Sequence, residues 1–141
     1  MTPATMSISP ETVLPKTILI AEDDPASREF IAEILRGRGY QVVEASTGVA
    51  ALKLFQRHHP DLVVIDIQMP ELDGFAVLRQ LRHLPLTAPV IAVTAHAMAG
   101  DRERALAAGF DEYLTKPVEA ARLRRRIAEL LSGGHPASSP R

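Results

Sequence analysis

The chain has 141 residues, of which 46% are hydrophobic, so a single domain with one covered core is expected. Its 16 basic and 17 acidic residues give a formal net charge of -1, which argues against nucleic acid or an anionic membrane as a partner. Cysteine is absent, which excludes disulfides and thiolate metal sites, and no apolar run approaches the roughly 20 residues of a membrane helix, so a cytoplasmic protein is expected.

The chain begins with a segment that has no periodic pattern. Residues 1–15 contain three prolines among serine and threonine, which predicts a flexible leader. A buried strand is predicted over 17–21, where an apolar run ends in three acidic residues. Pro25 suits the first turn of a helix, and from Phe30 onward apolar residues recur at helical spacing until two glycines end the pattern.

The same alternation continues to the middle of the chain. A strand is predicted over 40–45 and a helix over 48–58. The run from 62 to 65 is short, apolar and largely β-branched, which suits a strand covered on both faces, and Asp66 follows it directly. Met69-Pro70 then ends the strand, and Asp73-Gly74 turns the chain into the next helix.

The second half of the chain repeats this order. Its predicted elements are a helix over 74–84, a strand over 90–94, a helix over 100–108, a strand over 112–115 and a helix over 120–131. The helix over 100–108 is alanine-rich and weakly amphipathic, so we expect it to pack least firmly. Residues 132–141, rich in Gly, Pro and Ser, predict a disordered tail. Strands alternating with helices predict an α/β fold with a parallel sheet and helices on both faces.

Several of the predicted strands end in a polar residue at the same edge of the sheet. These residues are Glu22 and Asp23 after the first strand, Asp66 after the third, Thr94 at the end of the fourth and Lys116 after the fifth. Ligands gather at this edge of an open parallel sheet. If the first and third strands are neighbours, three carboxylates lie close together and oppose one another's ionisation unless a cation intervenes. Mg2+ is favoured over a transition metal because oxygen ligands dominate.

Lys116 and Thr94 extend the chemistry of this edge. A lysine facing the carboxylates can pair with Asp66, and it can hold a phosphate oxygen once Asp66 carries one. Thr94 offers a hydroxyl donor from the strand between them. A carboxylate nucleophile, a metal, a lysine and a hydroxyl are the groups that aspartyl-phosphate chemistry requires.

At these residues the chain resembles the receiver domain of two-component response regulators. The resemblance covers about residues 16–131 and rests on several motifs in order. The motifs are Ile-Leu-Ile-Ala-Glu-Asp-Asp at 18–24, Asp66 with Met69-Pro70 and Asp73-Gly74, Val-Thr-Ala at 93–95, and Tyr113 with Lys116-Pro117. Each motif alone is weak, but together, at these separations, they are highly specific. The resemblance implies a doubly wound, flavodoxin-like sheet of five parallel strands in the order 2-1-3-4-5 with five helices.

The resemblance also implies the ligands of the metal. Asp66 would be the phosphoacceptor, and Mg2+ would be held by Asp23, Asp66 and the backbone carbonyl of Gln68, with Glu22 helping through water. The family often has Asn where this chain has Gln68. Because the metal uses the backbone oxygen, the site should survive this change.

The remaining site residues would couple the phosphoryl group to an output surface. Thr94 would swing toward the phosphoryl group, Tyr113 would turn inward behind it, and Lys116 would hold a phosphoryl oxygen. The Lys116–Pro117 peptide bond would be cis, with Pro117 at its carboxyl side. The surface of the last two helices and the strand between them would then change and carry the signal.

The implied function is a phosphorylation-dependent signalling switch that supports its own phosphorylation and dephosphorylation, and is not a turnover enzyme. Its partners would be a histidine kinase or histidine phosphotransfer protein and a downstream target protein, and a homodimer stays open. The tail is too short for a DNA-binding output domain, so the signal would pass through protein contact, without nucleic acid or membrane. A stand-alone regulator, a phosphorelay shuttle and a receiver cut from a hybrid kinase all remain open.

Other functional classes fit the sequence less well. A Mg2+-dependent phosphatase with an aspartate nucleophile would need a second acid two residues after Asp66, where this chain has Gln68. A nucleotide or flavin binder would need a glycine-rich turn after the first strand, where the acids at 22–24 would repel phosphate. A degenerate receiver that binds partners without phosphorylation is a third alternative, against which the intact acidic set argues.

Several residues also have a simpler structural interpretation. Asp66 alone could be a cap, and Tyr113 could be a plain half-buried strand aromatic. The acids at 22–24 could be a solvated corner that suits the dipole of the following helix, and we assign Asp24 mainly to this capping role. The arginines at 122 and 124–126 are interpreted as a solvated helix face. Met98 is interpreted as a packing residue.

Overall fold

The computed structural model describes residues 14–85 and 87–133. Most of the predicted leader and tail therefore lies outside the described residues. In chain order the elements are β1 (Thr17–Ala21), α1 (Pro25–Arg36), β2 (Gln41–Ala45), α2 (Gly48–His58), β3 (Leu62–Asp66), α3 (Gly74–Leu81), β4 (Val90–Thr94), α4 (Asp101–Ala108), β5 (Glu112–Thr115) and α5 (Ala120–Leu131). The strands form one parallel sheet in the order β2-β1-β3-β4-β5, which confirms the predicted fold class and strand order.

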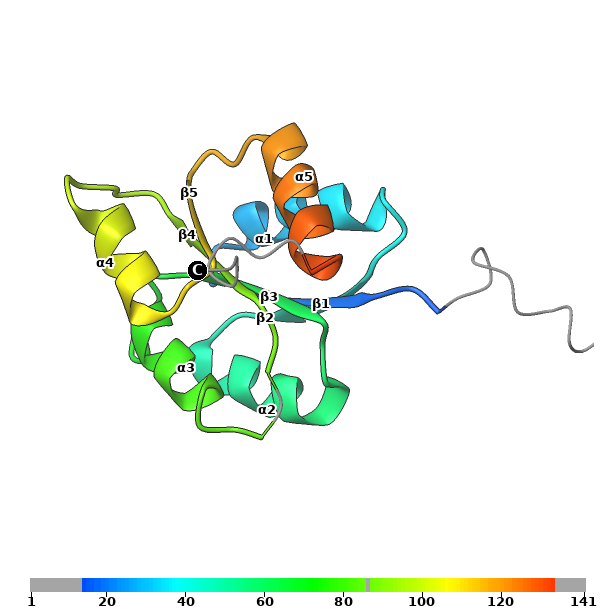
Figure 1. Cartoon of the computed structure of the whole chain (residues 1–141), viewed down its shortest axis with the longest axis horizontal. Helices are drawn as coiled ribbons and strands as arrows, with labels where there is room; N and C mark the ends of the chain where they lie inside the picture. Colours follow the sequence, from blue (N-terminus) through cyan, green and yellow to red (C-terminus); the bar gives the residue numbers. More distant parts are fainter. Residues whose placement is uncertain (1–13, 86, 134–141) are drawn as a thin grey trace, which may run out of the picture.

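Two helical layers cover the sheet, α1 and α5 on one face and α2, α3 and α4 on the other (Figure 1). Alternate residues of each strand face opposite layers, so the first face buries residues such as Ile18 and Val64, and the second buries Leu19 and Val63. Every residue of β3 and β4 is buried, as expected for strands covered on both faces. This two-sided burial explains why these strands are continuous apolar runs and show no polar alternation.

The strand register determines which loops meet at the carboxyl edge of the sheet. Ala21 pairs with Ile65 across β1 and β3, so the residues that follow each strand, Glu22 and Asp66, emerge side by side. On the other side of β3, β4 pairs with β5 and places Thr94 opposite Thr115. The polar residues singled out in the sequence therefore leave the sheet at one edge.

Gly74 allows the chain to pass close behind this edge. A Cβ atom at position 74 would lie 2.7 Å from the Ile67 Cα atom, closer than a side chain can approach, and 3.1 Å from the Asp66 carbonyl oxygen, which is a tight contact. The Gly74 amide also donates to the Ile67 carbonyl oxygen at 2.9 Å. The glycine thus lets α3 begin directly beneath the loop that carries Asp66.

The predicted helix over 74–84 is shorter in the structure, where α3 ends at Leu81. The amides of His83 and Leu84 bond three residues back, to Gln80 and Leu81, so the chain leaves the α-helix in a tighter turn. Pro85 follows this turn and disfavours helix in the residue before it.

Three side chains differ from their expected environments. Phe30 is 47% exposed because the buried stripe of α1 consists of Ile31, Ala32 and Leu35. Met98 is 74% exposed and does not pack in the core, which makes that interpretation wrong. The side chain of Arg126 is only 13% exposed, because it is paired with a buried carboxylate and does not extend into solvent.

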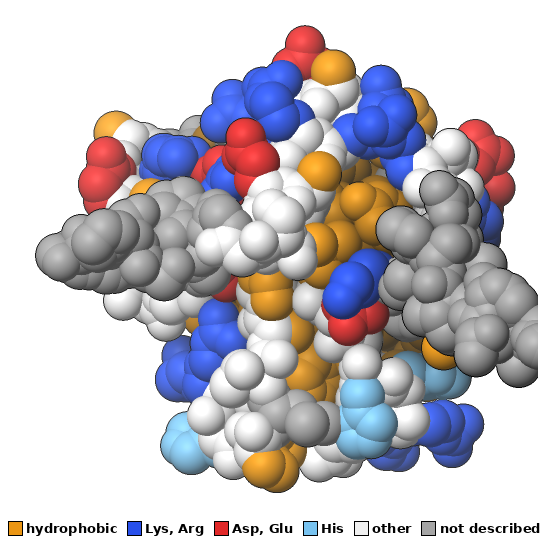
Figure 2. All heavy atoms as spheres, turned by 45° about the vertical axis from the view of Figure 1, so that its right-hand side comes forward, with side chains coloured by type: hydrophobic (Ala, Val, Ile, Leu, Met, Phe, Trp, Pro, Cys, Tyr) orange, Lys and Arg blue, Asp and Glu red, His pale blue; other side chains and the backbone are white. Residues whose placement is uncertain are grey.

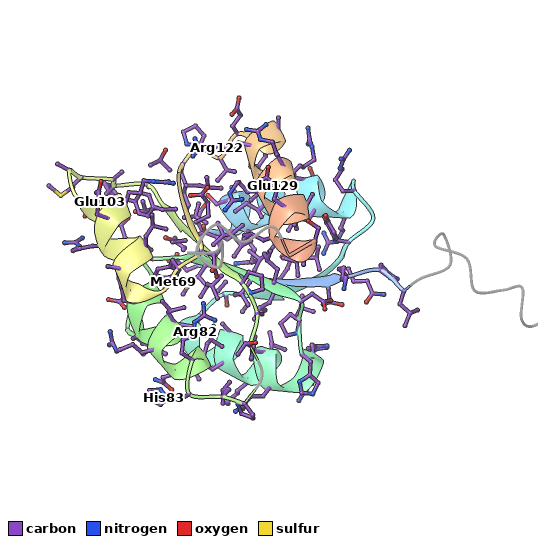
Figure 3. The ribbon with its side chains drawn as sticks, in the orientation of Figure 1. Met69, Arg82, His83, Glu103, Arg122 and Glu129 are labelled. Carbon is purple, nitrogen blue, oxygen red and sulfur yellow. The ribbon has the colours of Figure 1, made fainter. Side chains whose placement is uncertain are left out.

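The two helical layers differ in where histidine side chains lie on the visible surface. Figure 2 shows Lys and Arg side chains both over the part of the surface where Figure 1 places α1 and α5 and over the part where it places α2 and α3, with His side chains in the latter part. His83 lies at the end of α3 (Figure 3), where its Nδ1 atom is 2.7 Å from the Arg79 carbonyl oxygen. In the described part of the chain, no helix is long and apolar enough to cross a membrane.

Candidate phosphorylation and metal site

Three carboxylates meet at the carboxyl edge of the sheet. Glu22 and Asp66 are buried, with 1% and 5% of their surface exposed, whereas Asp23 is exposed. One carboxylate oxygen of each residue lies within 4.8 Å of the other two. Asp23 and Asp66 are distant in sequence, so the parallel pairing of β1 with β3 is what brings the acids together. The cluster is open to solvent on the side of Asp23.

Lys116 supplies the positive charge that faces these acids. Its Nζ atom lies 2.5 Å from Glu22 Oε1 and 3.2 Å from Asp66 Oδ2. Burial, reinforced by the nearby charge of Asp66, raises the pKa of Glu22 despite its bond to the lysine. Burial opposes the charge on Lys116, but its bonds to Glu22 and Asp66 outweigh burial and raise its pKa. One lysine therefore partly neutralises a site that contains more negative than positive charge.

Backbone amides hold the buried carboxylates in place. Asp66 Oδ1 accepts a hydrogen bond from the Gln68 amide at 2.9 Å, and Glu22 Oε2 accepts one from the Asp24 amide at 3.0 Å. The Asp24 side chain accepts from the Ser27 amide at 2.8 Å and is the N-cap of α1, which confirms its predicted capping role. Asp24 thus belongs to the helix terminus, and its neighbours Glu22 and Asp23 belong to the acidic cluster.

Thr94 and Tyr113 line a small cavity of about 80 Å3 next to the acidic cluster. Thr94 is 3% exposed, and its Oγ1 accepts from the His96 amide at 3.2 Å. Tyr113 is 6% exposed, and its hydroxyl is buried close to Asp101. Burial raises the pKa of this hydroxyl, and the charge of Asp101 raises it further. The tyrosine therefore already points inward in this structure.

The structure also shows a contact that the sequence does not indicate. His96 Nδ1 lies 2.9 Å from Gln68 Oε1, joining the loop after β4 to the loop after β3. The two residues are 28 positions apart, and neither belongs to a periodic pattern, so no sequence signal pairs them.

The Lys116–Pro117 peptide bond, at the end of β5, is cis.

The residues present fit a hard divalent cation. The cluster offers oxygen donors only, its ligand atoms lie within 4.8 Å of one another, and burial disfavours the charged form of Glu22. A cation would remove this cost, and Mg2+ suits a shallow site in which water and phosphate oxygens complete the coordination. Glu22, Asp23 and Asp66 are the side chains that would hold it.

The sheet is open and doubly wound, and the acidic cluster lies at its carboxyl edge between β1 and β3, where the strand order reverses. These features define a flavodoxin-like α/β protein with a ligand site at the switch point of the sheet. Comparison with known families then gives a specific assignment, because the response regulator receiver domain matches residues 18–128. The chain belongs to the receiver domain family of two-component signalling proteins.

Individual relatives are of two kinds. The polar-differentiation response regulator DivK of Brucella ovis is 37% identical over 122 residues, which cover 82% of this chain and 96% of DivK. The sensor histidine kinase RcsC of Escherichia coli K12 is 43% identical over 101 residues, which cover 72% of this chain and 11% of RcsC. The chain is thus similar to almost all of a small regulator and to a short part of a large kinase.

Solved structures support the fold assignment. The receiver domain of the sensor histidine kinase PA1611 from Pseudomonas aeruginosa PAO1 is 35% identical, with a TM-score of 0.77 over 84% of this chain and 98% of that one. That receiver domain contains a magnesium ion in its active site cleft. A response regulator from Chloroflexus aurantiacus gives a TM-score of 0.79 at 33% identity, over 84% of this chain and 98% of that one.

Proposed function

We propose that this receiver accepts a phosphoryl group on Asp66 from the phosphohistidine of a histidine kinase or a histidine phosphotransfer protein. The observation that carries the proposal is the meeting of three carboxylates from two strand ends, with the Lys116 amine 3.2 Å from Asp66 Oδ2. Asp66 is ionisable, fixed by a backbone amide and adjacent to a cation, as an aspartate nucleophile requires.

The transfer uses the side chains of this site in defined roles. A carboxylate oxygen of Asp66 attacks phosphorus, the phosphorus–nitrogen bond to the partner's imidazole breaks, and its electron pair stays on that nitrogen. Lys116 and the Thr94 hydroxyl provide donors for phosphoryl oxygens, so the added charge stays close to a cation. Because Asp66 needs no proton acceptor, the protein contributes position and charge.

A divalent cation would complete this charge balance. Glu22, Asp23 and Asp66, with the backbone carbonyl of Gln68, would hold Mg2+. When bound, the ion supplies a counter-charge for the phosphoryl oxygens. Glu22 keeps its bonds to Lys116 and the Asp24 amide, so the acidic corner is positioned before any ion arrives.

The signal would leave through the face formed by α4, β5 and α5. Phosphorylation at Asp66 would draw Thr94 and Lys116 toward the new oxygens, and both residues adjoin β5, since Thr94 pairs with Thr115. Tyr113 lies on β5 beside the cavity that Thr94 lines, so it would repack when Thr94 moves. A downstream protein would recognise the altered face by direct contact.

The first test is covalent labelling. Incubation with acetyl phosphate and Mg2+ should add about 80 Da to the wild type by intact mass, and nothing to Asp66→Asn. Asp73→Asn is the matched control, because Asp73 caps α3 and asparagine can also cap, so this variant should still be labelled. Labelling of Asp66→Asn would remove Asp66 from the role, and no labelling of the wild type would favour a receiver that works without phosphorylation.

The second test addresses the ion. Mg2+ at about 100 times its dissociation constant should stabilise the wild type by about 2.7 kcal/mol in thermal unfolding. Asp23→Asn should lose most of this effect, whereas Asp24→Asn should keep it, because Asp24 is the cap of α1. Equal stabilisation of the two variants would mean that Asp23 does not bind the ion.

A further inference from the structure

A groove of about 410 Å3 lies over β5, between α4 and α5. In Figure 1, β5 runs between these two helices, and in Figure 3, Arg122 stands near the beginning of α5. The residues that matter here are Arg102 from α4, Tyr113, Leu114 and Thr115 from β5, and Glu119 and Arg122 at the start of α5. We call this surface the β5 groove. Its two helical walls each provide an arginine.

Arg102 forms an ion pair with the buried carboxylate of Glu112 on β5. Glu112 begins β5 with a side chain only 6% exposed, and its two oxygens are held by different helices. Arg102 of α4 lies 2.9 Å from Oε1, and Arg126 of α5 lies 2.8 Å from Oε2. Burial opposes the charge of Glu112, but the Tyr113 amide and the two guanidinium groups outweigh it and lower the pKa of Glu112.

The two arginines are not equivalent. Arg126 is 13% exposed and fixed inside the structure, whereas Arg102 is 46% exposed and lines the β5 groove. If Arg102 turns toward another anion, Glu112 keeps Arg126 and its bond from the Tyr113 amide at 2.8 Å. Breaking a buried ion pair is costly when it leaves a buried charge without a partner. The release of Arg102 avoids this cost, because Arg126 still pairs with Glu112.

The strand at the floor of the groove offers backbone groups as well. The Tyr113 carbonyl accepts from Arg102 at 3.1 Å, and its amide donates to Glu112, so both groups face the outer edge of the sheet. The Lys116 amide donates to the Thr94 carbonyl oxygen on β4, and the backbone amides and carbonyls of successive residues in a strand point to opposite edges of that strand. Thr115 therefore directs its amide and carbonyl outward into the groove, where an extended segment could pair with them.

We propose that the β5 groove binds an acidic, extended segment of a partner protein, with Arg102 and Arg122 as its two anion contacts. This inference rests on the proposed function, since it names the kind of partner that the output face fits. Arg122 makes no ion pair among the described residues, and Arg102 can be released by Glu112, so both are available to carboxylates. Glu119 is the acidic residue of the lining, so the partner's acids would face the two arginines and avoid Glu119.

The test uses a defined probe, the capped peptide acetyl-Leu-Glu-Leu-Glu-Leu-Glu-amide, titrated into the unphosphorylated protein and followed by backbone amide shifts. Matched peptides with Gln or Lys in place of Glu are the comparison. We expect the Glu peptide to bind and to shift the amides of Arg102, Thr115 and Arg122. Each of Arg102→Gln and Arg122→Gln should weaken binding by about tenfold, the worth of one charge-assisted hydrogen bond.

A control variant tests whether peptide binding is specific to the β5 groove. Arg125→Gln removes an exposed arginine of α5 that does not line the groove, so it should bind the peptide like the wild type. The titration uses the unphosphorylated protein, so failure of peptide binding and failure of acetyl phosphate labelling are separate results. Far-ultraviolet circular dichroism of each variant would establish that it is folded.

Five results would overturn the proposal. The Gln peptide could bind as well as the Glu peptide, or Arg102→Gln and Arg122→Gln could leave the affinity unchanged. The Glu peptide could fail to bind or shift amides only outside α4, β5 and α5. Sedimentation could also show that the protein self-associates through this face in a manner that Arg102→Gln abolishes, in which case a second copy of the chain is the occupant.

Discussion

The unequal exposure of the two arginines that hold Glu112 leads to a quantitative prediction. Arg126→Gln and Arg102→Gln each remove one guanidinium group from the same carboxylate. The Arg126 pair is buried on both sides, with 13% and 6% of the side chains exposed, whereas Arg102 is 46% exposed. If burial sets the strength of these pairs, the two substitutions should differ widely in their effect on the free energy of unfolding.

The expected magnitudes follow from the cost of breaking each kind of pair. Loss of one partner of a buried pair costs roughly 3–5 kcal/mol, and we expect about 3 for Arg126→Gln because Arg102 still faces Glu112. An exposed pair contributes about 1 kcal/mol or less, so Arg102→Gln should cost about 1 kcal/mol including its bond to the Tyr113 carbonyl. In the double variant Glu112 has no cation, and the loss should exceed the sum of the single losses.

Urea unfolding at pH 7 measures these differences. With a slope of about 1–3 kcal/mol per molar urea, a difference of about 2 kcal/mol separates the two midpoints by about 1 M. Arg122→Gln is the control and should stay within about 0.5 kcal/mol of the wild type. Equal losses for the two arginines, or strict additivity in the double variant, would refute the idea that Arg126 is the permanent partner of Glu112 and Arg102 the exchangeable one.

Three further predictions concern stability. Folding lowers the pKa of Glu112, so the stability that its carboxylate contributes is present above about pH 4.5 and is lost as the pH falls through the folded-state pKa. In urea titrations at several pH values, Glu112→Gln should therefore lose less stability on acidification than the wild type. Gly74→Ala places a Cβ atom 2.7 Å from Ile67 Cα and should lower the unfolding free energy by about 1–3 kcal/mol, and wild-type stability in urea would contradict the close approach. Phe55 is 2% exposed, so Phe55→Ala should lower the free energy of unfolding by about 3–5 kcal/mol. Phe30 is 47% exposed, so Phe30→Ala should change it by less than about 0.5 kcal/mol. Similar shifts in melting temperature for the two variants would contradict their assigned environments.

Local patterns in the sequence were sufficient for the elements and their order. The apolar runs that became β1, β3 and β4 are short and end in polar residues, and the segments between them repeat at helical spacing. Crossover connections of this length make neighbouring strands parallel, so the acidic residues after β1 and β3 had to lie at the same edge. That Glu22, Asp23 and Asp66 would meet also requires β1 to pair with β3, which followed only from the strand order that the family resemblance implies.

The burial and the partners of individual side chains could not be predicted from local sequence patterns. Phe30 fits a helical apolar pattern, yet it is exposed, because the position of α1 on the sheet selects Ile31 and Leu35 for the core. Arg126 looks like its exposed neighbours in a basic helix, yet it turns inward to Glu112, 14 residues earlier. Neither outcome changes the local periodicity from which elements are predicted.

The sequence by itself determined the class of fold, the strand-end acids and the chemistry they suit, because these depend on residue type and on spacing within single elements. Only the tertiary structure decided that Glu112 lies between arginines of two helices and that His96 contacts Gln68. Both depend on how separate elements pack against one another, to within the few tenths of an ångström that distinguish a hydrogen bond from a missed contact. That placement results from the whole core, so no local pattern contains it.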